Sequence, residues 1–251
     1  MTDEKDQIQS FTSTEFAEII TGSNDAARAA FNNAFPRRIA PIAEAAAIAH
    51  RELARFATLR SPDERVHTVY LFLHGALNNT VTSTHLLVAG MPVASGHLMR
   101  HYAECIAMAM LCTDPGSGVL AEYSRMKTRY PVHKSTGRVG QARSAKRLRA
   151  LLGFDKMAWQ SFVQTVAFYD KFSHASSLSM AFQMMLNSPG QLIIGPEYDP
   201  GKRKELSKEL TSRRNALRVL PNTIRRIRAA LRTVPRHAGA AHAAGECSRR
   251  S

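Results

Sequence analysis

Cysteine, tryptophan and long apolar runs are scarce in this sequence of 251 residues. The three cysteines show no Cys-x-x-Cys spacing, which excludes a disulfide-stapled secreted domain and a zinc finger. Cys105 and Cys112 lie seven residues apart in apolar sequence, where free cysteines behave as small core residues. The sequence therefore predicts a reduced protein whose fold rests on its hydrophobic core.

No stretch of 18 consecutive apolar residues occurs, because polar side chains interrupt every candidate. We therefore expect no transmembrane segment. The first ten residues, MTDEKDQIQS, are polar and acidic, unlike a signal peptide. Together these absences predict a soluble, cytoplasmic protein.

Acidic residues are also in short supply, since 20 Asp and Glu stand against 34 Lys and Arg, a net charge of +14. The excess is confined to residues 116–160, which carry +8, and residues 197–251, which carry +9. Such concentrated positive charge is compatible with a polyanionic partner, either nucleic acid or an acidic membrane surface. It is equally compatible with a solvated basic surface that binds nothing.

The least charged part of the chain is residues 66–112, where the only formal charges are Arg100 and Glu104. The preceding segment, Ser-Pro-Asp-Glu at 61–64, is a strong helix start and predicts a helix that runs to about Ala89. Gly-Met-Pro at 90–92 separates it from a second helix that ends near Cys112. We expect these two helices to form the centre of the fold, wrapped by the rest of the chain.

The rest of the sequence also favours helices, so the predicted fold is all-α: one multi-helix bundle with two long central helices and a basic C-terminal helix. We expect the bundle to span residues 13–234, between a disordered N-terminus (1–12) and a disordered tail (235–251). After two short helices near the start, the further predicted helices cover residues 37–59, 117–129, 139–152, 156–186 and 200–231. We expect a loop from residue 133 to 138, and residues 191–195 (QLIIG) form the one strand-like run.

A cluster of polar side chains in GHLMRHYAE, residues 96–104, is the sharpest candidate site. His97, His101 and Glu104 fall at positions i, i+4 and i+7, so one helical face presents two imidazoles and a carboxylate. With a further ligand from a neighbouring helix they are candidate ligands of a transition metal; no other cofactor is predicted. The alternative is structural: Arg100 and Glu104 form an ion pair in the core, with the histidines as hydrogen-bonded neighbours.

A second polar cluster, YDKFSH at residues 169–174, interrupts an otherwise apolar helical segment. We expect this segment to meet the first cluster in one polar layer between two helices. The candidate catalytic residues are therefore Arg100, His101, Glu104, Asp170 and His174.

Two basic segments, residues 134–149 and 213–232, supply candidate contacts to nucleic acid. The second has the pattern of an amphipathic helix with arginines opposite an apolar face. Neither segment contains an aromatic residue on which a base could stack, so contacts to backbone phosphates are predicted. The candidate residues are Arg138, Arg143, Lys146, Arg147, Arg218, Arg225, Arg228 and Arg232.

Amides and hydroxyls are concentrated between Asn78 and Thr84, in the middle of the first central helix. These side chains could line a pocket for a small ligand. In the alternative interpretation they form hydrogen bonds between or within helices.

The order of features resembles a class of uncharacterised bacterial all-helical proteins, over about residues 40–190. In these proteins one helix carries an Arg and a Glu, as Arg100 and Glu104 here, and a later helix carries a Tyr, Ser and His cluster, as at residues 169–174. Some such bundles are similar to the HEPN group of toxin and defence ribonucleases, and this resemblance implies a ribonuclease. The HEPN motif needs an Arg and a His four to six residues apart on one helix. The pairs available here, Arg60 with His67 and Arg232 with His237, each straddle a proline.

The sequence is therefore compatible with three functions. The first is a non-enzymatic binding or accessory protein, connected with defence or stress, whose basic faces contact nucleic acid. The second is a HEPN-like or metal-dependent nuclease or hydrolase that uses the two polar clusters. The third is a regulatory module for a small ligand. A homo-oligomer is compatible with all three.

Overall fold

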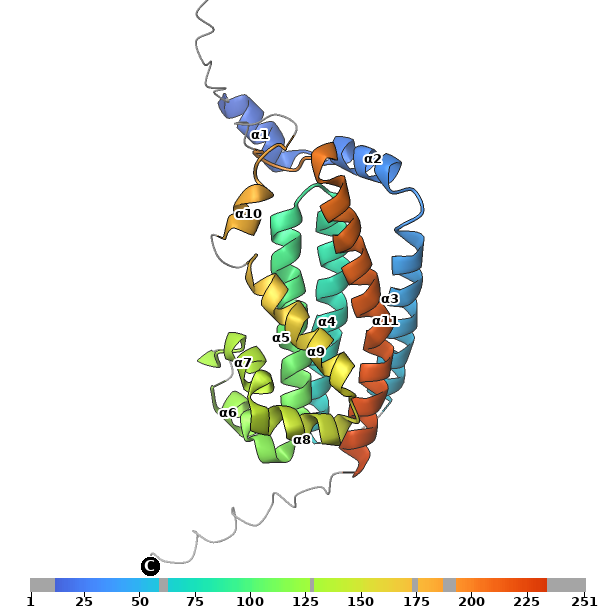
Figure 1. The fold of residues 1–251 in the computed structure, drawn as a ribbon, viewed down its shortest axis with the longest axis vertical. Helices are drawn as coiled ribbons and strands as arrows, with labels where there is room; N and C mark the ends of the chain where they lie inside the picture. Colours follow the sequence, from blue (N-terminus) through green and yellow to red (C-terminus); the bar gives the residue numbers. More distant parts are fainter. Residues whose placement is uncertain (1–11, 59–62, 127–128, 173–175, 187–192, 234–251) are drawn as a thin grey trace, which may run out of the picture.

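The computed structural model describes residues 12–58, 63–126, 129–172, 176–186 and 193–233, and every regular element in them is helical (Figure 1). The predicted all-α fold is therefore confirmed. The elements, in chain order, are α1 (Ser13–Thr21), α2 (Asp25–Ala34), α3 (Ala40–Ala57), α4 (Glu64–Val88), α5 (Pro92–Thr113), η1 (Pro115–Ser117), α6 (Val119–Met126), α7 (His133–Gly140), α8 (Ala142–Leu152), α9 (Lys156–Asp170), α10 (Ser177–Ala181), η3 (Pro200–Lys202) and α11 (Arg203–Thr233).

The central pair of helices, α4 and α5, forms where the sequence predicts it. Asp63 is the N-cap of α4, and its side chain accepts a hydrogen bond from the Arg65 amide. Between the two helices Gly90 has a φ of +80°, and a Cβ there would lie 2.6 Å from the Glu197 amide nitrogen. Only glycine fits this turn, because both its backbone conformation and its close contact exclude a side chain.

The core lies between this pair and the helices that cover it. From Tyr102 to its end, α5 is buried at every position except Cys105, and α4 packs along it more extensively than any other two elements pack. In Figure 1, α9 and α11 cross the near side of α4 and α5, while α3 packs mainly against α11. The helices α6, α7 and α8 gather at one end of the bundle, and α1, α2 and α10 lie at the other.

Two predicted elements differ from the structure. The single helix expected over 156–186 is wrong, because α9 ends at Asp170 and α10 begins separately. Ser176 caps α10 through a reciprocal pair of hydrogen bonds with Ser179, which fixes a new helix start. The loop expected over 133–138 is also wrong. Residues 133–140 form α7, whose buried Val139 and Ser135 hold it against the bundle.

The expectation that the rest of the chain wraps the two central helices holds on one side only. Within the described ranges, one face of α4 is exposed from His67 to His85, and it includes Leu71, 52% exposed, and Val81, 46% exposed. In the described part of the chain, α2, α3, α5 and α11 pack against α4. Of these, α2 touches the exposed face at its end, where Arg28 contacts His85.

Several predictions fall outside the described residues: the disordered N-terminus up to residue 11, the disordered tail at 235–251, the Ser61-Pro62 helix start, His174, and the first two residues of the strand-like run. Thr12, the last residue of the expected disordered N-terminus, is the N-cap of α1. No described helix is long and apolar enough to span a bilayer.

Candidate functional site

The predicted polar layer between α5 and α9 is present. Arg100 Nε lies 3.2 Å from Glu104 Oε1 and 3.2 Å from Asp170 Oδ1, so one guanidinium from α5 faces two carboxylates. His101 Nδ1 lies 3.3 Å from the other oxygen of Glu104. Four of the five candidate catalytic residues are therefore brought together, and the fifth, His174, lies outside the described residues.

The predicted metal ligands, His97, His101 and Glu104, are not grouped into a metal site. Within the described ranges, no three His, Cys, Asp or Glu side chains are grouped closely enough to hold a metal ion. Glu104 is nine-tenths buried and faces Arg100, whereas His97 lines a cavity at the start of α5. A metal site and the nuclease activity built on it therefore remain predictions that depend on residues beyond the described ones.

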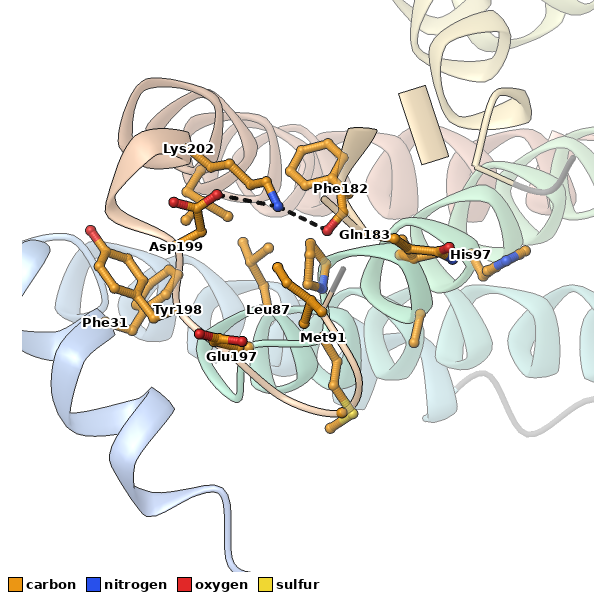
Figure 2. Close-up of a pocket in the computed structure, with 17 residues that line it drawn as sticks. Phe31, Leu87, Met91, His97, Phe182, Gln183, Glu197, Tyr198, Asp199 and Lys202 are labelled. Atoms are coloured by element: carbon orange, nitrogen blue, oxygen red, sulfur yellow. Dashed lines mark hydrogen bonds and ion pairs between the residues drawn. The ribbon is translucent and has the colours of Figure 1, made fainter. Parts of the chain in front are cut away.

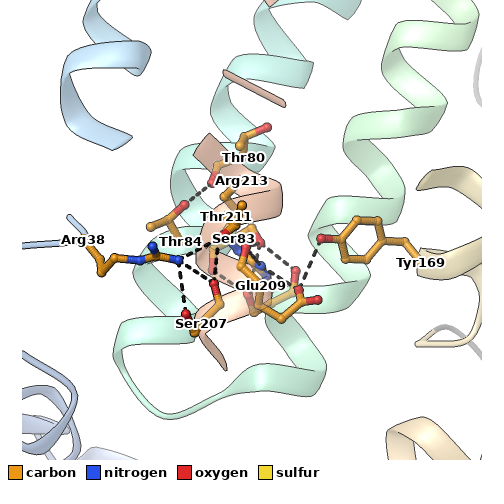
Figure 3. A network of polar contacts seen from close by, with 10 residues as sticks. Arg38, Thr80, Ser83, Thr84, Tyr169, Ser207, Glu209, Thr211 and Arg213 are labelled. Carbon is orange, nitrogen blue, oxygen red and sulfur yellow. Dashed lines mark hydrogen bonds and ion pairs between the residues drawn. The ribbon is translucent and has the colours of Figure 1, made fainter. Parts of the chain in front are cut away.

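A second polar layer, which the sequence pattern does not predict, lies deeper in the bundle (Figure 3). Arg213 of α11 is fully buried and donates from Nη1 to Glu209 Oε2 at 2.6 Å. Its Nη2 donates to Ser95 Oγ at 2.5 Å and its Nε to Ser83 Oγ at 3.2 Å. One guanidinium thus joins α4, α5 and α11 at a single point in the core.

Tyr169 connects this layer to α9. Its hydroxyl donates to Glu209 Oε2 at 3.2 Å, and the residue is 1% exposed. Burial raises the pKa of the Tyr169 hydroxyl, with the nearby Arg213 charge acting in the opposite direction. The phenol therefore stays protonated and acts as a hydrogen-bond donor that orients the carboxylate.

The polar patch at Asn78–Thr84 divides between two environments. Ser83 belongs to the buried layer, and Thr80 and Thr84 are buried with their hydroxyls donating to the carbonyls of Ala76 and Thr80. Asn78 faces solvent on the open side of α4. These side chains do not converge on one pocket, so the structure gives the small-ligand hypothesis no support at this place.

The two described cysteines are poor nucleophiles. Burial, helped by the Glu104 charge, raises the pKa of the Cys105 thiol to about 11, and burial raises that of Cys112 to about 12. Few thiolates exist at neutral pH under these conditions, which agrees with their predicted role as core residues.

A cavity of about 410 Å³ lies where α4 ends and α5 begins (Figure 2). Its walls come from α2, α4, α5, the segment 193–199 and the start of α11. They are mainly apolar, with Phe31, Leu87, Phe182 and Leu206 buried around it. Gln183 and His97 supply exposed polar groups among the lining residues. Its size is typical of sites for small molecules.

The one buried ion pair in the wall of this cavity is already satisfied. Lys202 Nζ lies 3.4 Å from Asp199 Oδ2 and donates to the Phe182 carbonyl at 3.0 Å. The carboxylate of Asp199 also accepts from the amides of Gly201 and Leu186, at 2.8 and 2.9 Å. The pair is therefore neutral as a unit and structural in role. The lining also includes the exposed Glu197, so the mainly apolar cavity suits an uncharged apolar molecule better than an anion.

Cations accumulate at the opposite end of the bundle. Helix α8 contains four Lys and Arg and residues 214–233 of α11 contain six, and neither segment contains an acidic residue. The two segments meet there, because the Arg226 guanidinium of α11 donates to the carbonyls of Leu152 and Gly153 at the end of α8. We call these two segments together the basic surface.

The residues predicted to contact nucleic acid differ in whether they already have a partner within the described part of the chain. Arg138 pairs with Glu122 at 2.9 Å and contacts the Tyr130 ring, and Arg147 pairs with Asp114. These two have structural partners. The other six have no ion-pair or hydrogen-bond partner in the described part of the chain: Arg143, Lys146, Arg218, Arg225, Arg228 and Arg232.

Comparison with known proteins gives no further guide to function, because no family model, curated protein or solved structure matches this chain.

Proposed function

We propose that this protein binds nucleic acid through its basic surface, by contacts to backbone phosphates. The observation that carries the proposal is the meeting of two basic segments, 142–152 and 214–233, without any carboxylate in either. Six of their cations have no partner in the described residues, so their charge is available to an external anion.

The arrangement of these cations supports phosphate contacts. Arg218, Arg225 and Arg232 are all exposed and recur every seventh residue, so they line one face of α11 about 10 Å apart. On α8, Arg143 and Lys146 are exposed at i and i+3, again on one face. A long row of cations matches the repeating charge of a nucleic-acid backbone, and the lack of aromatic residues predicts little sequence preference.

The first prediction is that Arg218→Gln/Arg225→Gln weakens binding to a duplex DNA or RNA, measured by fluorescence anisotropy. Each neutralised phosphate contact lowers the slope of log K against log salt by about 0.9, so the double variant should lose about two units of slope.

The matched control is Lys204→Gln/Lys208→Gln, which removes the same charge from exposed positions at the other end of α11. It should leave the slope close to that of the unchanged protein. Equal losses in both variants would show a diffuse charge effect and contradict the assigned surface. Binding to anionic vesicles, with none to nucleic acid at low salt, would assign the surface to a membrane instead.

A second candidate function is binding of a small, uncharged, mainly apolar molecule, and the cavity at the start of α5 favours it. Val93→Trp should fill the cavity, because Val93 is half-buried in its wall. We expect the neutral fluorescent probe N-phenyl-1-naphthylamine to bind the unchanged protein saturably at one site and not to bind this variant. An exposed substitution elsewhere, Met157→Trp, is the control. Equal probe binding by both variants would contradict this function.

A further inference from the structure

The open face of α4 carries no Asp, Glu, Lys or Arg after Glu64. The exposed positions of α4 after its first residue are His67, Leu71, His74, Asn78, Val81 and His85. No Asp, Glu, Lys or Arg occurs anywhere between residues 66 and 99, although the chain as a whole carries a net charge of +14. Protein surfaces that remain in water normally carry about 25–35% charged residues. A charge-free face on the longest central helix is therefore typical of a surface that becomes covered.

The spacing of this face indicates that another helix covers it. The six positions follow one another at intervals of 4, 3, 4, 3 and 4 residues. This alternation is the seam along which two helices pack side by side. Beside it, α5 presents Ala94, Leu98, His101 and Cys105 at intervals of 4, 3 and 4. The two rows adjoin, since Asn79 Nδ2 of α4 donates to Cys105 Sγ at 3.7 Å.

The chemistry of the face is symmetric about its middle. When α4 is paired with an antiparallel copy of itself about residue 76, Leu71 lies opposite Val81, His74 opposite Asn78, and His67 opposite His85. Apolar residues then meet apolar residues, and polar residues meet residues that can share a hydrogen bond with them. A two-fold interface needs this self-complementarity, because each residue i that contacts j requires that j contacts i.

We propose that this face, the α4 row with the α5 row beside it, binds a second copy of the same chain in an antiparallel two-fold dimer. The area suffices: a strip about 27 Å long and about 20 Å wide across two helices gives about 540 Å² per chain, or about 1,100 Å² for the pair. Stable interfaces need at least about 1,000 Å² in total.

The distribution of charge supports the same partner. Two chains of +14 repel each other over most of their surfaces, and the α4 face is a place where they can approach without bringing Lys or Arg together. The end of α4 lies beside the start of α11, because both line the cavity at Leu87 and Leu206. The basic surface lies at the opposite end of α11, so antiparallel pairing puts the two basic surfaces at opposite ends of the dimer. Arg28 is a cation that touches the α4 row, through His85 at 2.9 Å, and it does so at the end of the row.

The test is the molar mass of the full chain by light scattering coupled to size exclusion. The unchanged protein should have about twice the 27.7 kDa of one chain. Leu71→Lys and Val81→Lys should each give a monomer, because an ammonium placed on the seam would be buried without a partner. Both positions are half exposed, so the variants should retain their helical circular dichroism.

The register is tested by combining Leu71→Lys with Val81→Glu. In the antiparallel pairing each new ammonium faces a new carboxylate of the other copy, twice per dimer, so the double variant should recover the dimer that Leu71→Lys loses. The control is Val219→Lys, which alters an equally exposed valine on α11 and should leave the dimer intact. A monomer at every concentration, or a dimer that survives both single lysine variants, would overturn the proposal.

Discussion

At the scale of single residues, the most consequential side chain is Arg213. It is fully buried, yet all three of its guanidinium nitrogens have hydrogen-bond partners, on three different helices. A buried charge is tolerated only when it is paired and its donors are satisfied, and this network meets both conditions. We interpret it as the group that fixes how α11 sits against α4 and α5.

We therefore expect Arg213→Met to lower the free energy of unfolding by about 3–5 kcal/mol, measured by urea denaturation, because Glu209 is left buried without its cation. The double variant Arg213→Met/Glu209→Leu removes both charges and should recover much of this loss.

The control for this prediction is Arg218→Met, which lies on the same helix, is exposed, and should change stability by less than about 0.5 kcal/mol. An Arg213→Met protein as stable as this control would contradict the role assigned to the network.

At the scale of elements, the position of α9 depends on one glycine of α5. Gly96 is buried, and a Cβ there would lie 2.3 Å from two ring carbons of Phe172, just after α9. The ring of Phe172 therefore occupies the space of the missing side chain. This contact sets the depth at which α9 lies, and with it the distance from Asp170 to Arg100.

Gly96→Ala should therefore destabilise the protein by about 1–3 kcal/mol, as overpacking of a core does, although the same change in an open helix stabilises by up to about 1 kcal/mol. The change in the thermal unfolding temperature shows whether Gly96→Ala lowers or raises the stability of the protein. Adding Phe172→Leu should relieve part of the loss, because it removes the ring that the new methyl group meets.

Gly137→Ala in α7 is the matched control, since a Cβ there meets nothing within 4 Å, and it should stabilise slightly. A stabilising Gly96→Ala would show that α9 does not rest on this contact.

At the scale of the whole molecule, positive charge is concentrated in some regions and absent from others. The basic surface occupies one end of the bundle, the cavity lies toward the other, and the open face of α4 carries no Asp, Glu, Lys or Arg. In an antiparallel dimer the two basic surfaces lie far apart, so each can contact its own stretch of nucleic acid. Loss of the dimer should therefore weaken binding to a long duplex more than binding to a short one.

The sequence by itself determined the all-α fold and the two central helices, because capping residues, proline and helical periodicity act locally. It also predicted that Arg100 and Glu104 meet Asp170, since charged groups in apolar segments need one another. It misjudged the segment 156–186 as one helix, because its apolar pattern continues past Ser176, whose reciprocal hydrogen bonds with Ser179 begin a new helix.

Only the tertiary structure decided which polar residues share a site. Arg213 looked like one more arginine of a basic segment, and burial against Ser83 and Ser95, more than a hundred residues earlier in the chain, is what makes it structural. The uncharged stretch at 66–99 is the converse case. In sequence it resembles a fully enclosed core, yet none of the described helices covers the middle of one face of α4, because burial depends on how many neighbours surround a helix and not on its own composition.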